Sequence, residues 1–165
     1  MIDCATYAPL PDYYAGILWS KLMGSLVLKA ISEDPTLRAY AHCSAAGPGA
    51  ATVLLINLDP TMHRTVTLHG LLPAASEHDG RANGSGILEW HLTGPHGMNA
   101  TAMALNGKLL VAKVVAGGTE YDLPSLEGQQ APAQAQQAPQ LPVVQLAPAS
   151  IAFVQLATPT GVCSA

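Results

Sequence analysis

Residues 32–43 read SEDPTLRAYAHC, and the repeat of the apolar residues changes within this stretch. Before it, apolar positions recur every three to four residues, which is typical of an amphipathic helix. From Leu37 to Cys43, apolar and polar residues alternate, as in a strand with one buried face. The stretch therefore divides the chain into a helical lead and a β-rich remainder.

The segment before this boundary predicts one long helix over residues 12–31. Asp12, directly after Pro11, suits the first turn. Apolar residues also occur on the opposite side of the helix, so we expect it to pack against something large. The apolar positions with helical spacing are Ala15, Leu18, Trp19, Leu22, Met23, Leu26, Val27 and Ala30.

The remainder predicts a β-sandwich, because short strands at regular spacing with turns between them are typical of that architecture. Residues 52–58 (TVLLINL) are apolar on both faces and predict a central strand. Asn106-Gly107 lies between two apolar runs and predicts a hairpin with a type I′ turn. Further strands are expected at 37–43, 64–68, 87–92 and 151–156, and a long exposed loop at 73–86.

One segment interrupts this rhythm. Residues 128–140 read GQQAPAQAQQAPQ and contain only Gln, Ala, Pro and Gly. Because no side chain there is large enough to anchor a core, the composition predicts a disordered loop or a surface insertion.

Length and composition exclude several classes of protein. The chain has 165 residues, of which 11% are charged, and its net charge of −4 provides no basic footprint for nucleic acid. No apolar run reaches the roughly 18 residues of a transmembrane helix. A (β/α)8 barrel needs about 200 residues or more, so the chain is too short to contain one.

No catalytic set is predicted from the residues. Glu89 is the one carboxylate expected inside a regular element, whereas glycoside hydrolysis needs two carboxyls flanking one bond. The six histidines lack metal-ligand spacing, and no nucleotide-binding or nucleophile motif is found. We therefore predict no catalytic residue, no metal site and no cofactor. The best candidate for a sugar contact is Trp90, followed by Tyr40 and Tyr121, with ordinary packing as the expected role of each.

The sequence also carries signs of secretion. Asn83 and Asn99 begin sequons for N-glycosylation, although the N-terminus lacks the basic and apolar regions of a signal peptide. The cysteines are Cys4, Cys43 and Cys163, and their spacing matches no zinc pattern. They are either three unrelated thiols or one disulfide with one thiol left over.

Several motifs in this order resemble the heparanase-like enzymes of glycoside hydrolase family 79, in particular their plant and algal branch. The resemblance extends over nearly the whole chain. The motifs are PLPDYY at 9–14, ILWSKLMG at 17–24, LRAYAHC at 37–43, LINL at 55–58, HLTGPHG at 91–97, LNG at 105–107 and PASIAFV at 148–154.

This resemblance implies a place within a larger enzyme. Family members have a catalytic (β/α)8 barrel followed by a C-terminal antiparallel β-sandwich. Residues 1–32 then correspond to the last barrel loop and helix, and residues 33–165 to the sandwich, with the low-complexity loop at 128–140. The catalytic glutamates of the family lie upstream of every matched motif, so none is carried over to this chain.

The resemblance further implies that the parent hydrolyses β-glucuronide linkages in acidic polysaccharides or proteoglycans, with the upstream barrel as the partner of this chain. It implies a disulfide between Cys43 and Cys163, with Cys4 as the odd thiol. An oxidising compartment follows for the parent, which is expected to be secreted, membrane-associated or lysosomal or vacuolar.

Two other hypotheses remain open at this point. The chain could be a stand-alone secreted sandwich that binds carbohydrate or protein. Alternatively, it is an incomplete product with no role of its own, whose helix was built to face a barrel. Its apolar helix face would then be partly bare, and the isolated chain is expected to aggregate.

Overall fold

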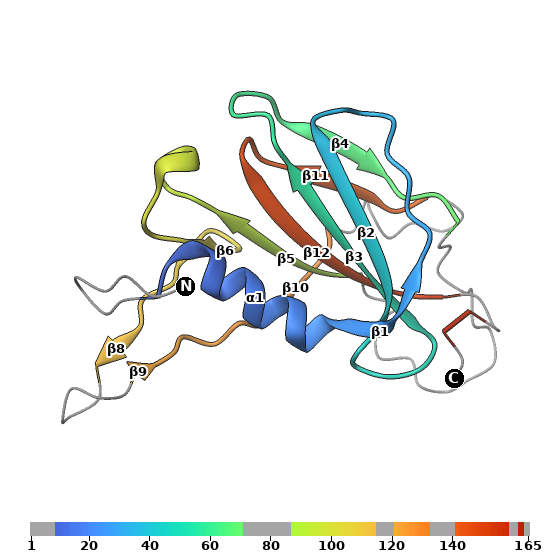
Figure 1. Ribbon diagram of the computed structural model, residues 1–165, viewed down its shortest axis with the longest axis horizontal. Helices are drawn as coiled ribbons and strands as arrows, with labels where there is room; N and C mark the ends of the chain where they lie inside the picture. Colours follow the sequence, from blue (N-terminus) through green and yellow to red (C-terminus); the bar gives the residue numbers. More distant parts are fainter. Residues whose placement is uncertain (1–8, 71–86, 115–120, 133–140, 159–161, 164–165) are drawn as a thin grey trace.

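The computed structural model describes residues 9–70, 87–114, 121–132, 141–158 and 162–163, which form a mainly β structure with one α-helix (Figure 1). In chain order the elements are α1 (Pro11–Leu22), β1 (Met23–Leu28), β2 (Leu37–Ser44), β3 (Ala50–Asn57), β4 (Arg64–Thr67), β5 (Leu88–Thr93), the 3-10 helix η1 (Gly97–Asn99), β6 (Ala104–Leu105), β7 (Lys108–Leu109), β8 (Lys113–Val114), β9 (Tyr121–Asp122), β10 (Gln129–Gln130), β11 (Val143–Leu146) and β12 (Ser150–Ala157).

An eight-stranded antiparallel sheet forms the body of the molecule. Its order is β1-β2-β3-β12-β5-β6-β7, and β10 pairs with β5. The longest strands lie in the middle, where β12 pairs with β3 from Ser150↔Asn57 to Ala157↔Ala50. The prediction that residues 52–58 form a central strand is confirmed, because β3 has neighbours on both edges and its core is apolar on both faces.

The two faces of this sheet are covered unequally (Figure 1). On one face, Leu18 and Leu22 of α1 pack in a cluster that includes Phe153 of β12. Burying each of those leucines contributes about 1.5–3 kcal/mol. On the other face, the small β4–β11 sheet supplies the cover, with Val144 and Leu146 fully buried. The expected antiparallel architecture is present, with a second layer of only two strands among the described residues.

The predicted helix over residues 12–31 is wrong in its second half. The helix ends at Leu22, and Met23–Leu28 form the strand β1, which pairs with β2 through Val27↔His42 and Leu28↔Ala41. Leu26 is 54% exposed and Val27 is 67% exposed, so the apolar spacing that suggested a buried helix face does not correspond to burial. Strand β1, which falls within the predicted barrel remnant, belongs to the same sheet as β2.

Tertiary contacts explain why the helix ends where it does. The carbonyl oxygen of Leu22 accepts hydrogen bonds from the Ala45 amide (3.0 Å) and from the Thr52 hydroxyl (2.9 Å). That oxygen is therefore satisfied without a further helical turn. Gly24 then runs so close to β2 that a Cβ there would collide with the carbonyl of Cys43. Only glycine fits this approach.

The predicted hairpin at Asn106-Gly107 is confirmed. Strands β6 and β7 pair through Ala104↔Leu109 and Leu105↔Lys108. Asn106 and Gly107 both have positive φ, 50° and 77°, as a type I′ turn requires. The Asn106 carboxamide oxygen also accepts the amide of His91 at 2.8 Å, which ties the turn to β5.

The start of the Gln/Ala/Pro segment is better ordered than its composition predicted. Gln129 and Gln130 form β10 against β5, and Ala131 is 4% exposed, with its amide donated to the Ile87 carbonyl. The segment is held by backbone hydrogen bonds to β5 and by the burial of the small Ala131 side chain, although it has no large apolar side chain. The predicted loop at 73–86 and the remainder of the segment, 133–140, lie outside the described residues.

Within the described ranges, no helix has both the length and the apolar character needed to cross a membrane.

Candidate functional site

Trp90, the leading sugar-contact candidate, lies in the core of the structure. Its side chain is only 6% exposed and packs in the cluster beneath α1. The indole Nε1 donates to the Leu126 carbonyl at 3.2 Å. Gly128 lies so close to the ring that a Cβ there would stand 2.6 Å from it. The indole therefore has no free face for a sugar, and packing in the core is its role here.

The weaker candidates lie elsewhere. Tyr40 on β2 is 46% exposed and meets Trp19 of α1, which is 40% exposed, edge to face with an interplanar angle of 72°. Two rings at this angle do not make one flat stacking surface. The side chain of Tyr121 lies outside what the structure describes. Of the two sequon asparagines, Asn99 is exposed at the end of η1, and Asn83 falls outside the described residues.

Glu89 is buried and engaged within the sheet. Its side chain is 5% exposed, and its Oε2 lies 2.8 Å from Nε2 of His91 on the same strand. The other carboxylate oxygen has no hydrogen-bond partner. A catalytic carboxylate must reach a bond of the substrate, and Glu89 points into the protein instead. We assign it a structural role.

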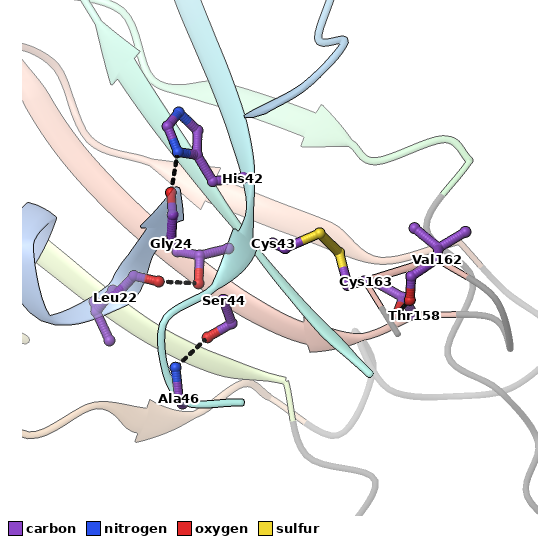
Figure 2. Close-up of a disulfide and its surroundings, with 10 residues drawn as sticks. Leu22, Gly24, His42, Cys43, Ser44, Ala46, Thr158, Val162 and Cys163 are labelled. Carbon is purple, nitrogen blue, oxygen red and sulfur yellow. Dashed lines mark hydrogen bonds between the residues drawn. A yellow bond between two sulfur atoms is a disulfide. The ribbon is translucent and has the colours of Figure 1, made fainter. Parts of the chain in front are cut away.

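Cys43 and Cys163 form a disulfide that fastens the C-terminal end of the chain to β2, with an S–S distance of 1.99 Å (Figure 2). The carbonyl of Cys163 also accepts the amide of Gly49 at 2.7 Å, and the Gly49 carbonyl accepts the amide of Thr158 at 2.8 Å. The bridge joins two positions that are 120 residues apart in the sequence, and the hydrogen bonds hold the same region together. Cys4 lies outside the described residues.

A groove of about 640 Å³ lies beside β4. Two unbroken stretches of chain form its walls, residues 28–34 between β1 and β2 and residues 64–70 along β4 and beyond. Its floor is the apolar face of the large sheet. The floor residues are Leu37, Ala39, Ala41, Val53 and Leu55.

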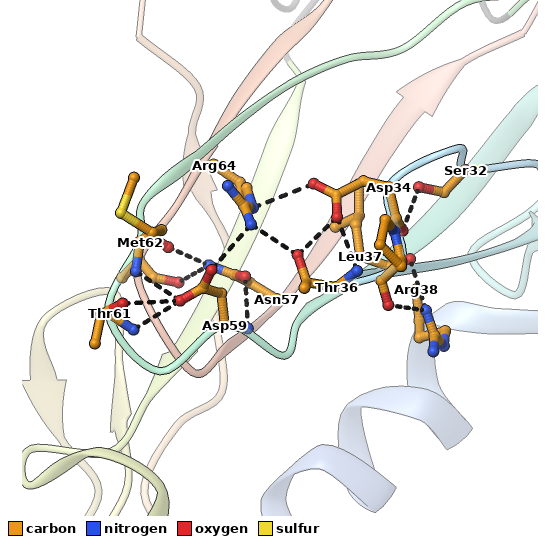
Figure 3. A network of polar contacts seen from close by, with 12 residues as sticks. Ser32, Asp34, Thr36, Leu37, Arg38, Asn57, Asp59, Thr61, Met62 and Arg64 are labelled. Carbon is orange, nitrogen blue, oxygen red and sulfur yellow. Dashed lines mark hydrogen bonds and ion pairs between the residues drawn. The ribbon is translucent and has the colours of Figure 1, made fainter.

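Arg64 joins the two walls of this groove (Figure 3). From β4, its Nε lies 3.2 Å from a carboxylate oxygen of Asp34 in the opposite wall. Its Nη2 lies 3.0 Å from Asp59 and donates to the Thr36 hydroxyl at 2.8 Å. A guanidinium holds several acceptors in a fixed geometry, so this cluster fixes the spacing of the walls at one end.

The two carboxylates of this cluster are held in the same way. The Oδ1 atom of Asp34 accepts the amide and the hydroxyl of Thr36 at 2.8 and 2.7 Å. The Oδ1 atom of Asp59 accepts the amide and the hydroxyl of Thr61 at 2.9 and 3.0 Å. Each aspartate begins an Asp-Pro-Thr triplet, at 34–36 and 59–61. Side chains of Asp often bond the backbone two residues on, so this repeat could have revealed the cluster in the sequence.

These contacts make the pair unsuited to acid catalysis. Hydrogen bonds from Thr36 lower the pKa of Asp34, and Arg64 lowers it further. Backbone hydrogen bonds from Thr61 and Met62 lower the pKa of Asp59. A general acid in glycoside hydrolysis needs a raised pKa, whereas both groups here favour the ionised form. The cluster therefore acts as a structural clamp.

The lowered pKa values predict a loss of stability in acid. A carboxyl whose pKa is lower in the folded than in the unfolded state stabilises the fold above about pH 4, and this contribution is lost as the pH falls through the folded value. We expect Asp59→Asn to reduce the loss of unfolding free energy between about pH 5 and pH 3, as measured by urea denaturation.

Glu33→Gln is the matched control, because it removes one negative charge from the groove wall next to Asp34, and Arg64 forms its ion pairs with Asp34 and Asp59. Its acid dependence should stay close to that of the unchanged protein. An Asp59→Asn profile that coincides with the Glu33→Gln profile would contradict the clamp.

The chain is similar to several curated proteins. Heparanase-like protein 1 of Arabidopsis thaliana is 36% identical over 151 residues, a match that covers 77% of this chain and 26% of that protein. Baicalin-beta-D-glucuronidase of Scutellaria baicalensis is 35% identical over 112 residues, covering 67% of this chain and 19% of that protein. The chain thus spans about a quarter or less of the length of these relatives. No family model matches the sequence.

Solved structures show a weaker likeness. The bifunctional glucanase-xylanase CelM2, from a metagenome library, superposes with a TM-score of 0.47 at 15% identity, covering 90% of this chain and 22% of CelM2. An alpha-L-arabinofuranosidase from Thermotoga maritima gives a TM-score of 0.38 at 14% identity, covering 77% of this chain and 20% of that one. These values carry no argument about function.

Proposed function

This chain belongs to the heparanase-like glycoside hydrolases and spans about a quarter of the length of its relatives in that family. We propose that it is the non-catalytic C-terminal part of such an enzyme. In the parent, this part packs on an upstream (β/α)8 barrel that carries the catalytic glutamates. The parent hydrolyses β-glucuronide linkages in acidic polysaccharides or proteoglycans. The observation that carries the proposal is the 36% identity to Heparanase-like protein 1 over 77% of the chain.

The described carboxylates support a non-catalytic role. Asp34 and Asp59 are held by Arg64 and by threonine hydroxyls, and Glu89 is buried beside His91. None of them faces another across a space that could hold a scissile bond with a proton donor on one side. The chemistry of the parent then depends on residues outside this chain.

The alternative of a stand-alone carbohydrate-binding sandwich has lost its main support. Trp90 is buried, and the exposed pair of Trp19 and Tyr40 meets edge to face. Carbohydrate binding by this chain alone is therefore the weaker proposal.

An oxidising compartment fits the parent. A disulfide that joins residues 120 positions apart is characteristic of secreted, vacuolar or membrane-associated proteins rather than of cytosolic ones. We place the parent in one of those compartments, where Asn99 would be accessible for glycosylation.

The first test of the proposal uses the purified chain and an aryl β-glucuronide. We expect no release of the aryl group above a buffer blank, because Asp34, Asp59 and Glu89 are held in structural contacts. Release that scales with the concentration of the chain would contradict the non-catalytic assignment.

A chimera tests the supporting role. In Baicalin-beta-D-glucuronidase, the region matched by this chain is either deleted or replaced by this chain, and hydrolysis of baicalin is measured with soluble yield. We expect the deletion to abolish activity and the replacement to restore part of it. A matched chimera carrying Phe153→Ala, which weakens the core beneath α1, should restore less. Full activity of the deletion variant would overturn the supporting role.

A further inference from the structure

We propose that Asn99 carries an N-linked glycan, and that the loop around η1 therefore lies on an outer surface of the parent enzyme, away from its contact with the upstream barrel. The attached group is an oligosaccharide whose first sugar is N-acetylglucosamine. This inference rests on the proposed function for two things, the secretory compartment that supplies the sugar and the barrel that the loop avoids.

The residues around Asn99 form an acceptor for this modification. Asn99-Ala100-Thr101 places a hydroxyl two residues after the asparagine, and the residue between them is not proline. The described residues include three asparagines, which are Asn57, Asn99 and Asn106. Of these three, Asn99 alone begins such a triplet.

The side chain of Asn99 is free, whereas those of the other two asparagines are engaged. The carboxamide of Asn57 donates to the carbonyls of Met62 and Ala147 at 2.8 Å each. The carboxamide of Asn106 ties its turn to β5. Asn99 is exposed, and within the described ranges no hydrogen bond involves its carboxamide. The fold therefore does not need the nitrogen that would carry the sugar.

The backbone of the loop directs this side chain outward. Figure 1 shows the turn of η1 standing out from the end of the sheet. Residues three positions apart lie on the same side of a 3-10 helix, and Gly97 and Ala100 both line a cavity of about 210 Å³ beside Pro11. Asn99 lies between them in the sequence and does not line this cavity. A glycan there would project into solvent and leave the packing beneath the loop unchanged.

Local contacts fix this shape of the loop. The amide of Ala100 donates to the Gly97 carbonyl at 3.1 Å, and Gly97 has a φ of 71°, which glycine adopts without strain. Thr101, whose hydroxyl belongs to the acceptor triplet, is exposed beside Asn99. Both side chains of the triplet that take part in the modification are therefore on the surface.

The modification is a transfer of an oligosaccharide from a lipid-linked oligosaccharide diphosphate. The Nδ2 atom of Asn99 bonds to the anomeric carbon of the first N-acetylglucosamine. The bond from that carbon to the diphosphate oxygen breaks, the lipid diphosphate leaves with the electron pair, and the amide loses one proton. The donor and its transferase belong to the secretory pathway, which the Cys43–Cys163 disulfide favours for this chain.

A glycan at Asn99 limits how the parent enzyme is assembled. An N-linked oligosaccharide is bulky and hydrated, so the surface around it is not buried against another domain. The contact with the barrel must then use other parts of the surface. The outer side of α1, where Trp19 is 40% exposed, remains available for it.

The first test uses the full 165-residue chain secreted from yeast, with Asn83→Gln in every variant so that the other sequon is removed. We expect mass spectrometry to show an oligosaccharide on the peptide that contains Asn99. Thr101→Ala should abolish this modification, and the matched variant Thr101→Ser, which keeps the hydroxyl, should retain it. If the chain stays in the cell, the same masses are read on the protein of the membrane fraction. An unmodified Asn99, or equal modification in Thr101→Ala, would overturn the proposal.

The second test examines the outer placement of the loop in the chimera of Baicalin-beta-D-glucuronidase that carries this chain. Endoglycosidase H is applied to the native chimera and to the native chain, and the peptide that contains Asn99 is followed with time. We expect the two rates of trimming to agree within about twofold, since burial against the barrel would slow access. Trimming that is about tenfold or more slower in a chimera that hydrolyses baicalin would contradict the outer placement. An inactive chimera contradicts the supporting role, and the first test decides the glycan independently of it.

Discussion

Replacing Cys43 and Cys163 together by serine is expected to lower the free energy of unfolding by about 5 kcal/mol. The bridge closes a loop of 120 residues. In the chain-entropy model, the restriction that a cross-link places on the unfolded chain grows with the logarithm of that loop length, which gives about 5 kcal/mol here. Native domains are stable by only about 5–15 kcal/mol, so the reduced protein should be marginal.

Thermal unfolding with and without dithiothreitol measures this effect. For a chain of this size, about 5 kcal/mol corresponds to a fall in Tm of about 10–20 °C. Cys4→Ser is the matched control, because it removes the third thiol and leaves the bridge intact. We expect it to melt with the unchanged protein. A double serine variant that melts within about 2 °C of the Cys4→Ser variant would show that the bridge does not stabilise the fold.

Phe153→Ala is expected to cost about 3–5 kcal/mol of unfolding free energy. Phe153 is 1% exposed at the centre of β12, where its register partners are Leu54 and Trp90 on the two neighbouring strands. All three face the layer that α1 covers. Truncation to alanine leaves a cavity that the sheet and the helix cannot fill without losing their own contacts.

Urea denaturation measures the unfolding free energy of Phe153→Ala and of the control Leu109→Ala. The comparison distinguishes a loss of core packing from a general effect of shortening a side chain. Leu109 on β7 is 50% exposed, and its removal should change the unfolding free energy by no more than about 0.5 kcal/mol. Equal losses in the two variants would contradict the seating of α1 on this face of the sheet. A loss in Phe153→Ala accompanied by an altered m-value would indicate a looser native state.

The strands could be predicted from the sequence because the patterns that indicate them lie within a few neighbouring residues. Alternation over 37–43, the doubly apolar run at 52–58 and the Asn106-Gly107 turn each correspond to an observed element. The same local reasoning failed at residues 23–28. Their apolar spacing is compatible with a helix, and only the capture of the Leu22 carbonyl by Ala45 and Thr52 ends the helix there. Those partners lie 23 and 30 residues further along the chain.

The site shows the same division. From the sequence, Trp90 is either packed in the core or in contact with a sugar, because burial on a face depends on which elements cover that face, here α1 and the Gly128 segment. The groove beside β4 could not be predicted, since its walls are separated by about thirty residues of sequence. The two Asp-Pro-Thr triplets were visible in the sequence, but not the fact that Arg64 joins them.

By itself, the sequence determined a mainly antiparallel β structure with a leading helix, the family to which the chain belongs, and the absence of room for a barrel. These follow from periodicity, turn chemistry and ordered motifs, all of which act over a few residues. Only the tertiary structure decided where α1 ends, which aromatic ring is buried, and that β4 and β11 form a separate small sheet. Each of these depends on contacts between distant segments, whose energies no local pattern encodes.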